Sequence, residues 1–296
     1  MRLTLRLPVP LTFKRFNSTT AARKVFHISF PGQISYLKAG AAQDLIVRRL
    51  LDYKASPSAF VFANGLNTAP TVPSIVMTMQ MEPTYTCGRR ERGTVSEEQR
   101  IELENGGVLG QAKFVEAQRG GQTTFHGPGQ MVAYPIIDLK SFNITPRCYV
   151  SMLEKVLISL FNSYSISAQT TENTGVWTDE DHKIAAIGIH VRRNITSHGI
   201  ALNIDTNLDW FRRIVACGLP DKQTTTMKEQ LGREVSFRDV EGGFVKELAR
   251  KLHCNIKDIV TVPIEELDAG MDETAFTLAV RELLETRGVL PTKSHT

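Results

Sequence analysis

The sequence predicts an α+β fold in which strands grouped in the middle of the chain are surrounded by helices. Two observations support this class. Apolar residues alternate with small or polar ones over 187–191 and over 200–204, which is the period of a half-buried strand. Apolar residues recur instead at helical spacing over 150–161, which predicts the clearest buried helix. With 296 residues, the chain is long enough to bury a sizeable core.

The first elements of the chain are predicted from composition and periodicity. Apolar residues spaced among charged ones over 42–53 predict an amphipathic helix. Residues 54–72 are rich in Ser, Pro, Ala and Asn, and therefore predict a loop or an insertion. The β-branched and apolar stretches 74–80 and 112–118 predict two strands.

The buried helix and the mid-chain strands have defined starting signals. Thr145 is a suitable N-cap, and Pro146 suits the first helical position. The alternating segments 187–191 and 200–204 predict two antiparallel strands joined through 194–198.

Two helices are predicted near the C-terminus. Ser236 with Asp239 resembles a capping box that opens a helix reaching about Leu252. A last helix over 272–287 ends before Gly288, a residue that commonly follows helix C-termini.

Positive charge is concentrated at the N-terminus. Seven basic residues precede the first acidic one, Asp44, and removing them leaves 28 basic against 31 acidic residues, so that the net charge of +4 becomes −3. The body of the chain is therefore not expected to bind nucleic acid. The leader also carries Ser, Thr and apolar residues but no acids, which predicts a mitochondrial targeting peptide over 1–25; a disordered basic arm is the alternative. No run of eighteen apolar residues predicts a membrane span.

The four cysteines are widely separated and show no metal-ligand spacing, so neither a disulfide framework nor a metal site is expected. They are Cys87, Cys148, Cys217 and Cys254. Cys217 precedes Gly218, and a turn there can expose both the thiol and backbone N–H groups. Only the thiolate is reactive, so a nucleophile would need a nearby cation; on residue types alone, a buried inert cysteine is the simpler reading.

A glycine-rich loop lies between two strand candidates at 119–130. Its glycines can expose backbone N–H groups, Arg119 can anchor an anion, and His126 can position or polarise a carbonyl. No Gly-Lys-Ser/Thr follows, so the loop is not a P-loop. A tight surface turn without a ligand remains the alternative.

Lys183 opens one of the two mid-chain strands. Counting by two places it on the apolar face of Ile187, unless a bulge, for which Gly188 is a candidate, breaks the alternation. A buried lysine can act as a base or stabilise a neighbouring thiolate, whereas a lysine at a strand end can equally extend its amine into solvent.

Three blocks together resemble the lipoyl(octanoyl) transferase family. They are RGGQTTFHGPGQMVAYPIIDL at 119–139, KIAAIGIHVRRNITSHGIALNIDTNLDWF at 183–211 and ACG at 216–218, and the resemblance spans about 80–230. It implies a single domain similar to the catalytic domains of biotin and lipoate protein ligases, with mixed β-sheets flanked by helices. The domain would occupy 26–296, with a core at 80–255 and a C-terminal helical extension at 262–296.

The resemblance also assigns roles to residues. Cys217 would carry the acyl thioester, and Lys183 would be its catalytic partner. The acyl-binding positions would be Arg119, Gly120, Gly121, Gln122, Thr123, Thr124, Phe125, His126, Ala186, Ile187, Gly188, Gly199, Ile200 and Ala201.

The implied reaction transfers octanoyl from octanoyl-acyl carrier protein to a specific lysine of a lipoyl domain, the first step of endogenous protein lipoylation. The acceptors would be the lipoyl domains of 2-oxoacid dehydrogenase complexes and the glycine cleavage H protein, in the mitochondrial matrix. No cofactor is implied, neither ATP nor a metal, and no nucleic acid or membrane partner.

Three alternatives remain. An ATP-dependent lipoate or biotin ligase of the same fold is one, since 88–93 weakly resembles the glycine-arginine loop of biotin ligases. A noncatalytic protein that binds lipoyl or carrier domains is another. The third is a cysteine hydrolase that pairs Cys217 with His126 or His198.

Overall fold

The computed structural model describes residues 24–63, 72–264 and 271–293, apart from the side chains of Pro31 and Cys217. The helices are α1 (Tyr36–Ala55), α2 (Glu97–Glu104), α3 (Pro146–Ser163), α4 (Met227–Leu231), α5 (Phe237–Lys251) and α6 (Glu273–Thr286). The strands are β1 (Val25–Ile34), β2 (Phe60–Val61), β3 (Ser74–Met81), β4 (Thr84–Cys87), β5 (Lys113–Glu116), β6 (Thr124–His126), β7 (Gln130–Ile136), β8 (Val176–Trp177), β9 (His182–Arg192), β10 (Ile195–Asn203), β11 (Gln223–Thr224), β12 (Ile259–Pro263) and β13 (Thr292–Lys293).

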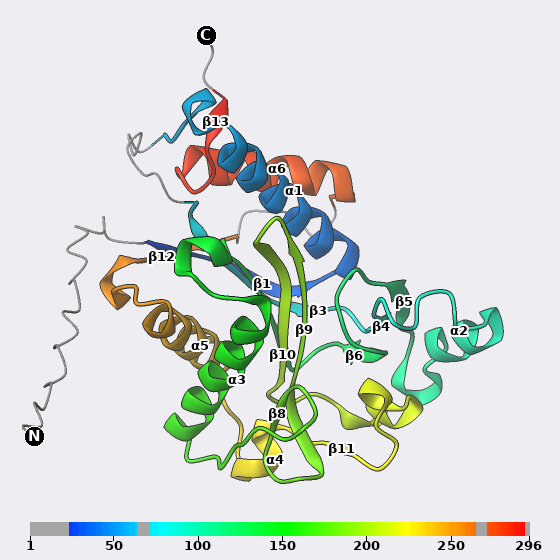
Figure 1. The fold of residues 1–296 in the computed structure, drawn as a ribbon. Coiled ribbons are helices and arrows are strands. Elements are labelled where there is room, and N and C mark those ends of the chain that lie inside the picture. Colours follow the sequence, from blue (N-terminus) through cyan, green and yellow to red (C-terminus); the bar gives the residue numbers. More distant parts are fainter. Residues whose placement is uncertain (1–23, 64–71, 265–270, 294–296) are drawn as a thin grey trace, which may run out of the picture.

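The fold is organised around a mixed sheet with the strand order β11-β9-β10-β7-β3-β1-β12, and β8 pairs with β9. Pairs β1–β3, β1–β12 and β9–β11 are parallel, whereas β3–β7, β7–β10 and β9–β10 are antiparallel. Helices α1 and α6 pack on one face of this sheet, and α3 and α5 pack on the other (Figure 1). The predicted α+β class, with mixed sheets flanked by helices, is therefore confirmed.

The predicted helices form because local caps and apolar stripes agree with the packing. Thr145, Ser236 and Asp272 each accept a hydrogen bond from a backbone N–H of the first turn that follows. The helix expected at 42–53 is longer than predicted, because Ser35 caps it and it begins at Tyr36, six residues before its apolar periodicity becomes clear. No helix within the described ranges is long and apolar enough to cross a membrane.

The β9–β10 hairpin is tighter than predicted. Only Arg193 and Asn194 connect the strands, both with positive φ (49° and 68°), as a two-residue turn requires. The expected connection at 194–198 was too long, because Ile195 to His198 already pair with β9.

The bulge that decides the direction of Lys183 lies beside it and not at Gly188. Val176 pairs with Ala185, but Trp177 pairs with Lys183, so that β9 carries one extra residue there. Across β10 the register of β9 stays regular from Ala185 to Arg192. The alternation therefore breaks before Ala185, which turns Lys183 away from the face predicted by counting.

The two segments expected to be extensions pack against each other. Within 54–72, strand β2 pairs antiparallel with β13, which lies within 262–296. Helix α6 buries Phe276, Val280 and Leu284 in the core that it shares with α1. Both segments therefore have a packing role.

The predicted targeting peptide, 1–25, lies outside the described residues except for its last two. Strand β1 begins at Val25, which is fully buried, and β1 lies between β3 and β12. Removal of residues 1–25 would therefore take the first residue, Val25, from an inner strand of the sheet.

Candidate active site

A cavity of about 410 Å³ lies beside the β9–β10 hairpin. From the predicted site it brings together Arg119, Gly120, Gly121, Gln122, Thr124, His126, Lys183, Ala186, Ile187, Gly188, Gly199, Ile200 and Ala201. Segments more than 70 residues apart thus converge on one cavity, whose volume is in the range typical of small-molecule sites.

Thr123 and Phe125 are the members of the predicted loop that do not line this cavity. The backbone N–H and hydroxyl of Thr123 both donate to Glu91, at 2.6 Å. Phe125 is fully buried and stacks on Trp210, with ring centroids 4.9 Å apart. These two residues hold the glycine-rich loop in place through contacts outside the cavity.

Arg119 holds the glycine-rich loop together through hydrogen bonds to protein oxygens, and its role as an anchor for an anion stays a prediction. Its Nη1 donates to the carbonyl oxygens of Gly120 and Gln122, and its Nη2 donates to the carbonyl and hydroxyl oxygens of Thr86, at 2.7–3.0 Å. The side chain is 7% exposed, and only Nε has no hydrogen-bond partner. Its guanidinium therefore shapes the cavity wall and places a positive charge beneath it.

His126 is the end of a buried hydrogen-bond relay. Its Nδ1 lies 2.8 Å from Oε1 of Gln130, whose Nε2 donates to Asn203 Oδ1 at 2.9 Å and to a carbonyl oxygen. Asn203 in turn donates through Nδ2 to the carbonyl of Thr225. Because every amide nitrogen faces an acceptor, Gln130 presents an oxygen to His126, and the proton of the imidazole belongs on Nδ1.

The relay leaves Nε2 of His126 with a free lone pair. Burial, and secondly the charge of Arg119, lower the pKa of His126 to about 4, so the ring is neutral near pH 7. A neutral ring with Nδ1 protonated accepts hydrogen bonds at Nε2. This tautomer does not polarise a carbonyl, which is one of the two roles considered from the sequence.

His198 lies in the same wall but is not tied into the relay. Its Nδ1 is buried without a partner, and its ring meets Tyr134 edge-on at 5.3 Å. Burial, and then the charge of Arg119, lower its pKa to about 3. This histidine is therefore also neutral.

Lys183 lies at the base of the cavity with 8% of its surface exposed. Its Nζ lies 4.7 Å from the ring centroid of Trp177, a cation–π geometry that holds the side chain in place. Its backbone carbonyl accepts a hydrogen bond from Thr225, which joins it to β11.

Cys217 lies in the one-turn segment Ala216–Gly218, and its side chain is outside the described part of the structure. Ala216 and Leu219, on either side of it, each line a cavity that Lys183 also lines. Gly218 has φ +68° and lies so close to Gln122 that a Cβ would overlap its side-chain amide. The amides of Gly218 and Leu219 donate within the turn, so these N–H groups are already engaged.

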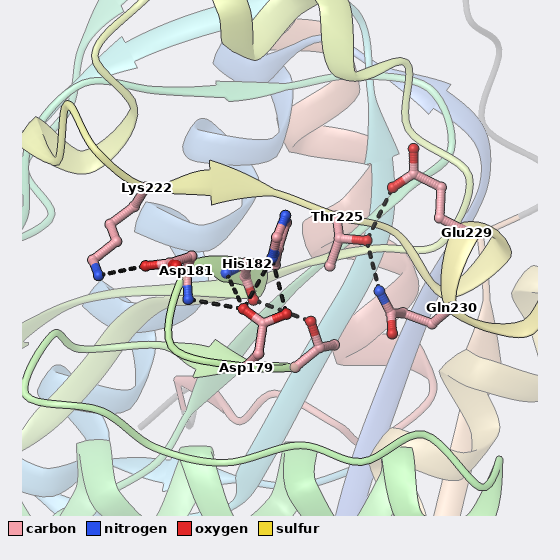
Figure 2. A network of polar contacts seen from close by, with 8 residues as sticks. Asp179, Asp181, His182, Lys222, Thr225, Glu229 and Gln230 are labelled. Atoms are coloured by element: carbon pink, nitrogen blue, oxygen red, sulfur yellow. Dashed lines mark hydrogen bonds and ion pairs between the residues drawn. The ribbon is translucent and has the colours of Figure 1, made fainter.

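A polar network ties the segment after Cys217 to the strand that carries Lys183 (Figure 2). Lys222 pairs with Asp181 at 2.8 Å, and the backbone N–H of Gln223 donates to the Asp181 carbonyl. Asp179 receives hydrogen bonds from the backbone and ring of His182, which fixes the turn before β9. The two predicted catalytic residues are thus carried by backbone segments that are hydrogen-bonded to each other.

Glycine and alanine occupy facing positions on the two strands of the hairpin. Gly188 pairs with Gly199 across the two strands, and Ala186 pairs with Ala201. At Gly199 a Cβ would overlap the carbonyl oxygen of Ala133, so only glycine fits against β7. At Gly188 a Cβ would lie 3.0 Å from the carbonyl oxygen of Gly120, so both glycines allow neighbouring segments of the chain to pack closely, while Ala186 and Ala201 contribute small side chains to the cavity lining.

Several site residues were not singled out from the sequence. Gln130 and Asn203 form the relay, Trp177 holds Lys183, and Arg90 lines the cavity. Gln130 and Asn203 lie within two of the distinctive blocks, but nothing local indicates that they meet. Of the other cysteines, Cys87 and Cys254 are buried, whereas Cys148 is exposed on α3.

Within the described ranges, no cluster of three or more His, Cys, Asp or Glu side chains is arranged to hold a metal ion.

Comparisons with known proteins agree on one family. Residues 64–249 match the family model of the lipoyl protein ligase A/B catalytic domain. The chain is 48% identical over 230 residues to a Schizosaccharomyces pombe protein named probable octanoyltransferase, with 76% of this chain and 96% of that protein covered. It is 36% identical over 239 residues to a Danio rerio protein named octanoyl-[acyl-carrier-protein]:protein N-octanoyltransferase LIPT2, mitochondrial, with 80% and 96% covered.

A solved structure supports the fold. A putative lipoate protein ligase from T. acidophilum with bound lipoic acid has a TM-score of 0.57 to this chain at 14% identity, with 89% of this chain and 95% of that one covered. The expected similarity to lipoate ligase catalytic domains is therefore confirmed at the level of fold.

Proposed function

This chain belongs to the lipoyl protein ligase A/B catalytic domain family and is an octanoyltransferase, and we propose that it carries the octanoyl group as a thioester on Cys217. The reaction is the first step of endogenous protein lipoylation. The observation that carries the proposal is that Lys183, Ala186 and Ala201 line two cavities, and that Ala216 and Leu219, on either side of Cys217, both line the smaller of them.

In the first half-reaction, the thiolate of Cys217 attacks the thioester carbonyl of octanoyl-acyl carrier protein. A new sulfur–carbon bond forms, the bond between the acyl carbon and the carrier sulfur breaks, and the carrier leaves as a thiolate that takes up the proton Cys217 has lost. The charge of Lys183, held by Trp177 at the cavity base, favours the thiolate over the thiol. Because the N–H groups of Gly218 and Leu219 are engaged, the side-chain amide of Gln122 is the better placed donor to the carbonyl oxygen.

In the second half-reaction, the amine of an acceptor lysine attacks the thioester on Cys217. A carbon–nitrogen bond forms, the bond between the acyl carbon and the Cys217 sulfur breaks, and the proton that the amine loses passes to the leaving sulfur, which restores the thiol. The hydrogen bonds of Gln130 and Asn203 fix Nε2 of His126 as an acceptor. Nε2 therefore accepts a hydrogen bond from the incoming amine, and this orients the lone pair of the amine nitrogen toward the thioester carbonyl.

The acyl chain binds along the small residues of β9 and β10. At about 0.8 kcal/mol for each buried CH₂, a fully buried octanoyl tail contributes roughly 5 kcal/mol. The glycine and alanine pairs would then set the chain length that fits.

Several finer assignments follow from the same proposal. The catalytic unit is a single domain over 26–296, preceded by a targeting peptide that directs the protein to mitochondria and, more specifically, to the matrix. The acceptors are the lipoyl domains of 2-oxoacid dehydrogenase complexes and the glycine cleavage H protein. Since the acyl group arrives as a thioester, no ATP, metal or other cofactor is required.

The proposed function is tested by incubating chain 26–296 with octanoyl-acyl carrier protein and a lipoyl domain, without ATP or metal. The expected result is a single octanoyl adduct on one lysine of the domain. Transfer that requires free octanoate and ATP would identify a ligase instead. Release of octanoate without an acceptor would identify a hydrolase, and binding without either product would identify a noncatalytic protein.

A further inference from the structure

Three exposed arginines lie near the cavity and are called here the basic rim: Arg89, Arg90 and Arg192. Arg90 lines the cavity itself. The backbone of Arg89 donates to the carbonyl of Arg119 at 3.0 Å, and the next residue, Gly120, donates to the carbonyl of Ile189 at 3.0 Å. These two hydrogen bonds place Arg89 beside β9, the strand that ends at Arg192.

The lowered pKa of His190 indicates that Arg89 and Arg192 lie close enough to act on the same side chain. Burial and then the charges of Arg89 and Arg192 lower the pKa of His190, which lies between the glycine-rich loop and the end of β9. Arg192 and His190 also line a wider groove beside α1, and His198 lines both this groove and the cavity. The rim therefore borders the cavity on the side that opens to the surface.

Within the described ranges, the three rim arginines form no ion pair, in contrast to Arg92, which pairs with Glu116. Asp44, which acts on His190 with the opposite sign, forms an ion pair with Arg48. Glu91, which follows Arg90 in the sequence, accepts hydrogen bonds from the backbone N–H and the hydroxyl of Thr123. The acidic residue in the cavity wall, Glu172, acts on Lys222 at the opposite end, beside the segment of Cys217.

From this arrangement we infer that the basic rim binds the phosphodiester at the base of the pantetheine arm of the acyl donor, while the arm extends into the cavity toward Lys183. The inference rests on the proposed function. Arginine suits the partner because its planar guanidinium donates two parallel hydrogen bonds to phosphate oxygens. A rim of free charges near a cavity also speeds the encounter with an anionic donor. The lipoyl acceptor brings an amine and needs no phosphate site.

The test compares two small donors that differ only in the anion: octanoyl-4′-phosphopantetheine and octanoyl-pantetheine. Acyl-enzyme formation is measured by intact mass for the wild type, for Arg89→Ala/Arg192→Ala and for Arg90→Ala. The control is Arg250→Ala, an exposed arginine on α5 whose partner is Glu247. Exposed ion pairs contribute about 0.7 kcal/mol each, so the double variant should lower the preference of the enzyme for the phosphorylated donor about tenfold.

The expected pattern has three parts. The preference falls in the rim variants and not in the control, high salt reduces it in the wild type, and the Michaelis constant for the lipoyl domain is unchanged. An unchanged preference in the rim variants refutes the inference, as does a rise in the Michaelis constant for the lipoyl domain with no change for the donor. A wild type that forms no acyl-enzyme with either donor refutes the thioester proposal, which is a separate result.

Discussion

Substituting Ala186 by leucine tests whether the cavity-lining residues of β9 and β10 determine which acyl chain length the enzyme prefers. Ala186 lies opposite Ala201, and both line the cavity. Leucine adds three carbons at this point. A bound octanoyl chain would then lose the burial of about three methylenes, whereas hexanoyl, two carbons shorter, would lose about one. The difference of two methylenes amounts to roughly 1.6 kcal/mol, or about a fifteenfold change in preference.

The assay is a competition between octanoyl- and hexanoyl-carrier protein, read by intact mass of the acyl-enzyme. Ala186→Leu should shift the ratio toward hexanoyl about fifteenfold, while the rate with hexanoyl falls only about fourfold, as expected for the loss of about one buried methylene. Val191→Leu is a control on the opposite face, where Val191 packs against the core under α3 and α5. An unchanged ratio, or an equal loss with both donors, would refute the placement of the chain along β9 and β10.

Three further predictions concern the polar part of the site. Lys183→Met keeps the length of the side chain but not its charge, so acyl-enzyme formation should fall at least tenfold at pH 7 and recover above about pH 8.5, where a free thiol ionises by itself; equal loss at all pH values would contradict this role. Gln130→Leu breaks the relay to His126, so transfer to the lipoyl domain should slow about tenfold in single-turnover experiments while acyl-enzyme formation is retained; equal slowing of both halves would exclude a role specific to the amine. The folded-state pKa of His126 lies near 4, below the ordinary value of 6.5, so the unfolded chain binds more protons between these values, and stability is present above about pH 6.5 and lost as pH falls toward 4. Denaturation midpoints at pH 4.5 and 7 should therefore differ less in His126→Gln than in the wild type, and an unchanged difference would count against a neutral buried ring.

Features that depend on neighbours in sequence could be predicted well. The caps Thr145 and Ser236 act on the turn that follows them, and the alternation over β9 and β10 predicted a hairpin that the structure contains, although β10 is buried over its whole length and not on one face only. Most of the residues selected by the family resemblance line one cavity. Local patterns therefore predicted these elements, whereas the candidate site was selected by the resemblance.

Features that depend on distant partners could not be predicted. The direction of Lys183 is decided by a bulge opposite Trp177, and counting along β9 alone gives the wrong face. The tautomer of His126 depends on Asn203, which meets Gln130 only after the sheet forms. The charge of Arg119 is visible in the sequence, but the hydrogen bonds that its guanidinium donates to the carbonyl oxygens of Thr86 and Gln122 could not be predicted.

The thioester mechanism is tested most directly by the intact mass of chain 26–296 after incubation with octanoyl-acyl carrier protein, without ATP or acceptor, for the wild type and for Cys217→Ser. We expect one octanoyl adduct on the wild type that maps to Cys217, is released by thiol reagents and moves to a lipoyl domain when one is added. The serine variant should carry no such adduct. An adduct at another residue, or catalysis by Cys217→Ser at the wild-type rate, would contradict the thioester mechanism.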